Sequence, residues 1–185
     1  MDIFAFAVSV FALLVLPGPT NAILAMTSLG LTLSRMGVLV AAVLLSYLAV
    51  ILPISSFAGP FLQHHPAVSQ GVKLASATWV FYLALKLWGI PGKADPSGLG
   101  VRQLVTTTLL NPKAIIIALT MLPPQGIIAL DVLTAFLVAA TGSSCIWLSI
   151  GRAILGDADE MPLVVRRCGS AALLGFCVLL TVSAF

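Results

Sequence analysis

Two long stretches without a charged side chain decide what this chain can fold into. Residues 3–34 and 36–72 contain no Asp, Glu, Lys or Arg, and only Arg35 separates them. A transmembrane helix needs about 20 mainly apolar residues to cross roughly 30 Å of hydrocarbon. Each stretch is therefore too long for one membrane span. A cleaved signal peptide does not explain the first stretch, because Asp2 stands where basic residues belong.

Composition excludes a soluble globular domain. Hydrophobic residues make up 60% of the 185 residues and charged residues only 8%, against about 25% charged in soluble domains. The net charge of +3 is spread between apolar segments and forms no basic patch for nucleic acid. The length fits one domain. We therefore expect a single transmembrane domain over residues 1–185.

The apolar segments between charges and turn residues predict six transmembrane helices. Their expected ranges are 3–30, 37–59, 72–90, 103–123, 127–150 and 165–185, with the first turn at residues 35–37. Helices are required because lipid offers no partner to open backbone groups. The expected fold class is an all-α polytopic membrane protein.

Basic residues predict how these helices are oriented. Seven of the nine Lys and Arg residues fall at the first, third and fifth connections, namely Arg35, Lys86, Lys93, Arg102, Arg152, Arg166 and Arg167. The second connection holds only Lys73, and the fourth holds none. By the positive-inside rule the odd connections are cytoplasmic, which puts both termini outside and Trp88 and Trp147 near the cytoplasmic interface.

An internal repeat relates the two halves of the chain. Residues 19–27 (PTNAILAMT) match residues 112–120 (PKAIIIALT) in proline, isoleucine, alanine and threonine at one offset, and residues 73–77 match 167–171 at nearly the same offset. Two copies of three helices must be inverted, since three is odd. The expected halves are about 1–92 and 101–185, with a cytoplasmic connection at about 91–102.

The first helix of each half contains a helix breaker in its interior. Pro17, Gly18 and Pro19 interrupt one helix, and Asn111 with Pro112 interrupts the other. Proline removes a backbone donor and clashes with the preceding turn. One isolated proline is explained by a kink, but breakers at matching places in both halves indicate discontinuous helices, where secondary transporters bind substrate.

Lys113 is expected near the membrane midplane, roughly 16 Å along the helix from Arg102. Burying a lysine there costs at least about 2.5–3.5 kcal/mol, and no Asp or Glu is expected at that depth. The lysine snorkels, rests on carbonyls freed by Pro112 or is neutral; alternatively, it forms a positive pocket for a substrate carboxylate with the amides after Pro19 and Pro112. We favour the pocket.

The other candidate residues are polar or aromatic. In the pocket, Thr20 and Asn21 add hydroxyl and amide partners, and Asn111 either holds the broken backbone or contacts the ligand. Trp79 and Tyr82 either line a substrate path or pack against lipid or in the protein core, and we favour packing. Ser143 and Ser144 serve helix packing or line the path, and Ser46 is a further possible lining residue.

Metal and redox chemistry find little support in the sequence. The three cysteines, Cys145, Cys168 and Cys177, have no CxxC and no metal-ligand spacing. His64 and His65 have no third ligand nearby, so a solvated turn is favoured over a metal or pH-sensing site. We expect no metal site.

With these residues in view, the chain resembles the LysE/RhtB (lysine-exporter type) family of bacterial amino-acid translocators. Residues 16–21 (LPGPTN) and 110–114 (LNPKA) stand where that family has its Pro-Gly-Pro and Asn-Pro-Lys signatures, and residues 73–86, including Tyr82, look like its third span, with Ser76 in place of a usual glycine. The resemblance covers nearly the whole chain.

The resemblance implies proton-coupled export of amino acids, a homodimer, the bacterial inner membrane and no bound cofactor. Many members carry an acidic residue in the second span, but residues 42–47 (AVLLSY) contain none. Lys113 is then the only titratable candidate at the midplane for proton coupling.

Three other functions would each need residues of a recognisable kind. A small ion or metal permease needs acidic or histidine ligands at the midplane, a redox carrier needs a cysteine beside each break, and an enzyme needs paired carboxylates or a nucleophile motif. The sequence shows none of these. We therefore expect a non-enzymatic transporter of amino acids or related small zwitterionic metabolites, with the permease as the alternative.

Overall fold

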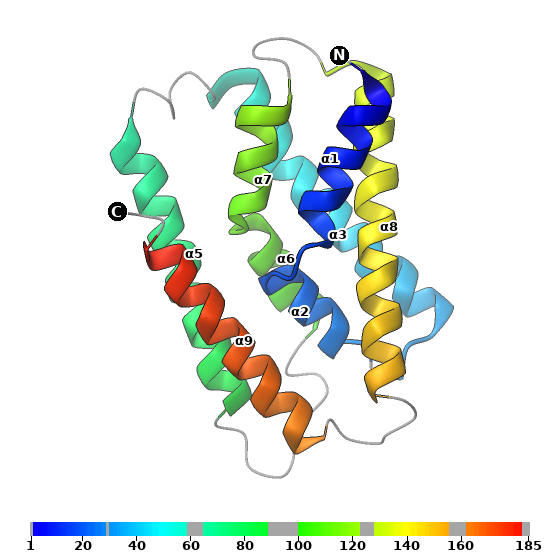
Figure 1. The fold of residues 1–185 in the computed structure, drawn as a ribbon, viewed down its shortest axis with the longest axis vertical. Helices are drawn as coiled ribbons and strands as arrows, with labels where there is room; N and C mark the ends of the chain where they lie inside the picture. Colours follow the sequence, from blue (N-terminus) through cyan, green and yellow to red (C-terminus); the bar gives the residue numbers. More distant parts are fainter. Residues whose placement is uncertain are drawn as a thin grey trace.

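The protein, analysed as a computed structural model, is described over residues 2–28, 30–58, 65–88, 100–122, 128–155 and 162–182, and these residues form helices without a β-strand (Figure 1). A π-helical turn follows α3 and another follows α7. The elements are α1 (Ile3–Val15), α2 (Pro19–Met26), α3 (Leu33–Pro53), η1 (Ile54–Ala58), α5 (Pro66–Trp88), α6 (Val101–Leu109), α7 (Pro112–Ile116), η3 (Ile117–Met121), α8 (Leu130–Leu155) and α9 (Leu163–Val182).

Three helical segments are long and apolar enough to cross a membrane. They are Leu33–Ser56, α8 and α9. Two bent pairs also pass when each is taken as one span: α1 with α2, bent by 67°, and α6 with Pro112–Met121, bent by 41°. The described part of the chain thus contains three to five candidate spans, which makes it compatible with a membrane protein. The six-span arrangement, which would include α5, stays a prediction.

Two element boundaries differ from the expected ones. The predicted turn at residues 35–37 is wrong, because Arg35 and Gly37 lie inside α3. The chain turns earlier, where Gly30 adopts a φ of 60° that favours glycine, and Thr32 Oγ1 accepts the Arg35 N–H at 3.2 Å to cap α3. Helix α5 begins at Pro66 rather than near residue 72, since proline fits the first position of a helix.

The helices pack in pairs that each join the two halves of the sequence. Helix α1 lies along α8, α3 along α6 and α5 along α9 (Figure 1). The interior takes a fully buried apolar side chain from each of these helices and from α2 and η3, namely Val10, Leu24, Leu39, Leu83, Leu104, Ile117, Leu148 and Leu173. Exposed side chains such as Phe4, Leu45 and Leu179 are apolar too, as expected of helices that face lipid.

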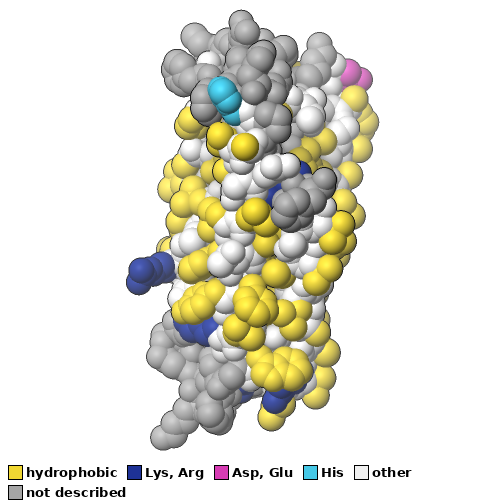
Figure 2. Space-filling model, turned by 90° about the vertical axis from the view of Figure 1, so that its left-hand side faces the viewer, with side chains coloured by type: hydrophobic (Ala, Val, Ile, Leu, Met, Phe, Trp, Pro, Cys, Tyr) yellow, Lys and Arg dark blue, Asp and Glu magenta, His cyan; other side chains and the backbone are white. Residues whose placement is uncertain are grey.

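Charged side chains lie mainly at the two ends of the bundle. The end of α5, the end of α8 and the start of α9 lie lowest in Figure 1 and carry Lys86, Arg152, Arg166 and Arg167, and we call this end the basic end. Arg35 and Arg102 stand in the first turns of α3 and α6. The opposite end holds Asp2, His65 and Asp131. Figure 2 shows a largely hydrophobic middle between them. Trp88 lies at the basic end, where the Arg167 guanidinium stacks 3.9 Å from the centre of its ring.

The predictions for the connecting segments fall partly outside the described residues. Lys93, His64 and most of the connection at about 91–102 belong to segments that the structure does not describe. His65 is exposed.

Candidate functional site

Two helices of the bundle are broken, and after each break the next helix begins at a proline, Pro19 for α2 and Pro112 for α7. Between α1 and α2 the chain is extended at Leu16 and Gly18. Between α6 and α7 it passes through Leu110 and Asn111. A proline at the first helical position has no N–H to lose and a φ already suited to a helix. The breaks therefore lie where the sequence predicts them, and each leaves the carbonyl groups at the end of the preceding helix without partners in that helix.

Side chains from three elements close the carbonyl end of α1. Asn21 Nδ2 donates to the carbonyl oxygens of Leu14 (2.7 Å) and Leu16 (2.8 Å). Trp147 Nε1 donates to Val15 O at 3.1 Å, and Lys113 Nζ donates to Leu16 O at 2.5 Å. A cation at this position also offsets the negative end of the helix dipole. The first break is thus held from α2, α7 and α8 together.

The second break is held by the other half of the chain. Ser76 Oγ, on α5, donates to the carbonyl of Leu110. Asn111 Oδ1 accepts the Lys113 N–H at 3.0 Å and so caps α7. One turn before the break, Trp79 Nε1 donates to Thr107 Oγ1 at 2.8 Å.

A buried polar cluster, made of Thr20, Tyr47, Thr108 and Asn111, joins the two breaks. Asn111 Nδ2 donates to Thr20 Oγ1 (2.9 Å) and to Tyr47 Oη (3.2 Å), and Thr108 Oγ1 lies 3.4 Å from Thr20 Oγ1. All four side chains are at most 5% exposed. Buried polar groups are stable when they are hydrogen-bonded, so this cluster holds α2, α3 and α6 to the start of α7.

The contact that Lys113 makes agrees in part with the interpretation that it rests on backbone carbonyls. Its ammonium rests on a carbonyl, but on Leu16 O of the first break rather than on a carbonyl freed by Pro112. The side chain is half-buried. Gly18 makes this approach possible, because a β-carbon there would lie 3.2 Å from Nζ and 3.3 Å from Cε.

The two helix starts differ in how their amides are satisfied. The expectation of an exposed amide directly after Pro112 is wrong, because Asn111 accepts the Lys113 N–H. Gly18, the residue before α2, has no side chain to accept the first amides of that helix. Among the described residues, no acceptor is recorded for the N–H groups of Thr20 and Asn21. The Thr20 and Asn21 N–H groups are therefore unpaired donors at the start of α2, and the neighbouring Gly18 is the residue that the Lys113 ammonium approaches.

The structure brings most of the predicted site residues together. Gly18, Thr20, Asn21, Asn111 and Lys113 share the contacts described above. The prolines flank them: Pro19 is buried, Pro112 is half-buried and Pro17 is exposed. The side chains of Thr20 and Asn21 are already engaged by protein groups, so these two residues hold the breaks in place.

The predicted path-lining residues lie at the edges of this site. Ser46 and Ser144 donate back to carbonyls of their own helices, Ala42 O and Ala140 O, and Ser143 is buried in α8. Trp79 is tethered to Thr107, and Tyr82, half exposed, lies 5.5 Å from it between ring centres.

Sequence reasoning missed several residues of the site. Tyr47, Thr108 and Ser76 were not predicted to take part, and Trp147 was expected at the membrane interface. The interface placement of Trp147 stays a prediction, and its indole also donates to Val15 O at the first break. A signal was present in the polar residues 106–108 (TTT) and 46–47 (SY), which stand inside otherwise apolar segments.

Metal-ligating side chains do not gather in the described part of the chain. No three His, Cys, Asp or Glu residues there lie close enough to hold an ion. Comparisons with models of protein families, with curated proteins and with solved structures found no match.

The capping role of Asn21 gives a first prediction. Asn21→Ala is expected to lower the free energy of unfolding by about 1–3 kcal/mol, because it removes the side-chain donor to the buried Leu14 carbonyl, while Leu16 O keeps Lys113. Thermal unfolding of the purified protein in detergent, followed by tryptophan fluorescence, measures the change. Thr78→Ala is the control, since that exposed hydroxyl bonds only to Leu74 O of its own helix. Equal stability of Asn21→Ala and the wild type would contradict the capping role.

Proposed function

We propose that this chain is a membrane transporter that exports amino acids or related small zwitterionic metabolites. One observation carries the proposal: the two helix breaks meet, and the groups that hold each break come from both halves of the chain. Discontinuous helices that meet inside a bundle are the usual binding site of secondary transporters. A kinked structural helix does not need a second break beside it.

The contact between Lys113 and Leu16 is what a zwitterion would replace. A cargo carboxylate would accept from the Lys113 ammonium and from the open amides at the start of α2, where the helix dipole favours an anion. The cargo ammonium would donate to the carbonyl end of α1 at Leu16, which Lys113 now contacts. Lys113 is half-buried and Leu16 is 55% exposed, so the pair is open on one side. The carboxylate and the ammonium of one small zwitterion thus match two adjacent protein groups, the Lys113 ammonium and the Leu16 carbonyl.

Pairing of the helices supports alternating access between two inverted halves. Under the repeat, α1 corresponds to α6 and α8 to α3, so the observed pairs α1 with α8 and α3 with α6 are equivalent. Ser76 and Ser170, matched in the repeat, both bond across to the other half, at Leu110 O and Ala84 O. Rocking of such halves about a fixed site is the general scheme for these folds. Proton coupling through Lys113 belongs to the same proposal.

The setting we propose follows from charge and from the family resemblance. The basic end faces the cytoplasm by the positive-inside rule, which leaves both termini outside a bacterial inner membrane. The resemblance to the lysine-exporter family supports export as the direction and a homodimer as the assembly.

The deciding experiment identifies the cargo without assuming it. The full chain is expressed in a bacterial host that lacks its own amino-acid exporters, and extracellular metabolites are profiled against an empty-vector strain. We expect a severalfold rise in one class of amino acid, abolished by a protonophore. An unchanged profile with altered metal tolerance would reject amino-acid export in favour of the small ion or metal permease.

A further inference from the structure

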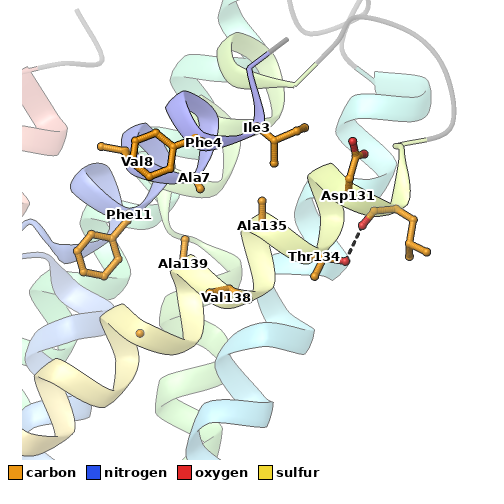
Figure 3. A pocket seen from close by; sticks show the side chains of 12 residues that line it. Ile3, Phe4, Ala7, Val8, Phe11, Asp131, Thr134, Ala135, Val138 and Ala139 are labelled. Atoms are coloured by element: carbon orange, nitrogen blue, oxygen red, sulfur yellow. Dashed lines mark hydrogen bonds between the residues drawn. The ribbon is translucent and has the colours of Figure 1, made fainter.

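A wide apolar groove runs between α1 and α8 on the outer surface of the bundle (Figure 3). Its volume is about 1040 Å³. Phe4, Val8 and Phe11 of α1 line one side, while Ala135 and Ala139 of α8 line the other. Because both walls include small residues, Ala7 on α1 and Ala135, Ala139 and Gly142 on α8, the two helices leave an open apolar channel between them.

The groove has one polar end. Among the described residues that line it, the polar side chains are Asp131 and Thr134, both on the first turns of α8. Thr134 Oγ1 donates to Leu130 O within its own helix, so its hydroxyl is engaged. The Asp131 carboxylate accepts the Val132 N–H at 2.8 Å and is otherwise exposed. The groove therefore offers one available charge, a negative one, at its mouth.

The groove also has the length of one leaflet. It runs along α8 from Asp131 to Gly142, which at 1.5 Å per residue is roughly 16 Å, about half of a 30 Å hydrocarbon core. Asp131 lies at the end of the bundle opposite the basic end. The polar mouth is thus at the membrane surface on that side, and the apolar channel ends near the midplane, where Phe11 packs beside Gly142.

From this geometry we propose that the groove binds one phospholipid with a primary-amine head group, of the phosphatidylethanolamine type. One acyl chain lies in the channel between α1 and α8, and the head-group ammonium pairs with the Asp131 carboxylate. Charge complementarity favours this lipid over an anionic one, which the carboxylate repels. A helix of a second copy is less suited, since it would cover the carboxylate without supplying a cation. The inference rests on the membrane location of the chain and is independent of its cargo.

Head-group recognition is tested on the purified full chain by native mass spectrometry. Phosphatidylethanolamine, its N,N-dimethyl derivative, phosphatidylcholine and phosphatidylglycerol with identical acyl chains compete for the protein in detergent. We expect binding to weaken along the methylated series, by about fivefold from the first lipid to phosphatidylcholine, and phosphatidylglycerol to bind worst. Asp131→Asn is expected to remove the preference among the zwitterionic lipids. Equal binding of all four lipids to the wild type would overturn the proposal, even if Asp131→Asn fails to fold.

The place of the acyl chain is tested by filling the channel. Ala135→Phe is expected to lower lipid occupancy severalfold, whereas Ala172→Phe, the same change at an exposed position of α9, keeps it. Unchanged occupancy in Ala135→Phe would show that the lipid binds elsewhere. A loss of dimer mass in Ala135→Phe, with lipid binding unchanged, would show that a second copy occupies the groove. Either result rejects the lipid site.

Discussion

Lys113→Met is expected to reduce transport roughly 10- to 100-fold at low cargo concentration. A hydrogen bond to a charged group contributes about 1.5–3 kcal/mol, which corresponds to that range of affinity. Methionine has a similar length and keeps the packing against Gly18. Uptake of a labelled mixture of the standard amino acids into proteoliposomes, driven by an imposed pH gradient, measures the effect.

The fold is expected to survive this substitution, so that lost transport is informative. Leu16 O keeps its bond from Asn21 Nδ2 at 2.8 Å when Lys113 is removed, and the first break stays capped. Arg152→Met is the matched control, because it also replaces a cation with methionine, at an exposed position in the last turn of α8. Undiminished transport by a folded Lys113→Met protein would reject the proposed role of the ammonium.

Gly151→Ala is expected to destabilise the protein more than a methyl added at any other glycine that the structure describes. Gly151 lies on α8 where the end of α2 crosses it, and a β-carbon there would overlap the Ala25 carbonyl oxygen and lie 2.5 Å from Ser28 Oγ. Backbone cannot yield as a side chain does, so the two helices must separate. We expect a cost of about 3 kcal/mol and a fall in Tm of roughly 6–12 °C, measured by thermal unfolding in detergent.

The control for Gly151→Ala is the same change on an open helix face. Gly175 on α9 has nothing within 4 Å of a built β-carbon, so Gly175→Ala should be neutral or raise stability by up to about 1 kcal/mol through helix propensity. Transport by Gly151→Ala should fall as well, since α2 carries Thr20 and Asn21. If both variants unfold at the same temperature, the close crossing of α2 and α8 is refuted.

Much of the architecture was predictable because its signals are local. Uncharged stretches predicted apolar helices, and three to five candidate spans are present. The prolines at positions 17, 19 and 112 predicted both breaks, because a missing N–H acts on the turn in which it stands. The turn at residues 35–37 was mispredicted for a local reason too, because Arg35 and Gly37, two positions apart, resemble a loop. The chain instead turns at Gly30, and Thr32 caps the helix that follows.

The partners of the site residues were not predictable in this way. Lys113 and Leu16 stand 97 positions apart, and Trp147 and Val15 stand 132 apart. No periodicity or spacing in the sequence relates such pairs. The polar pair Ser46 and Tyr47 stood out within an apolar helix, but the partner of Tyr47, the Asn111 amide 64 positions away, could not be read from the sequence.

The sequence by itself determined that the chain forms apolar helices, where two of them break and at which end the basic residues gather. Charge, hydropathy and proline act through nearby atoms or through the membrane, so their effects follow from position along the chain. The tertiary structure alone decided which donor satisfies which freed carbonyl, because that depends on the distance between helices from opposite halves. It placed the Lys113 ammonium on the carbonyl of Leu16 at the first break rather than on a carbonyl of the second, and it left the start of α2 without a side-chain cap.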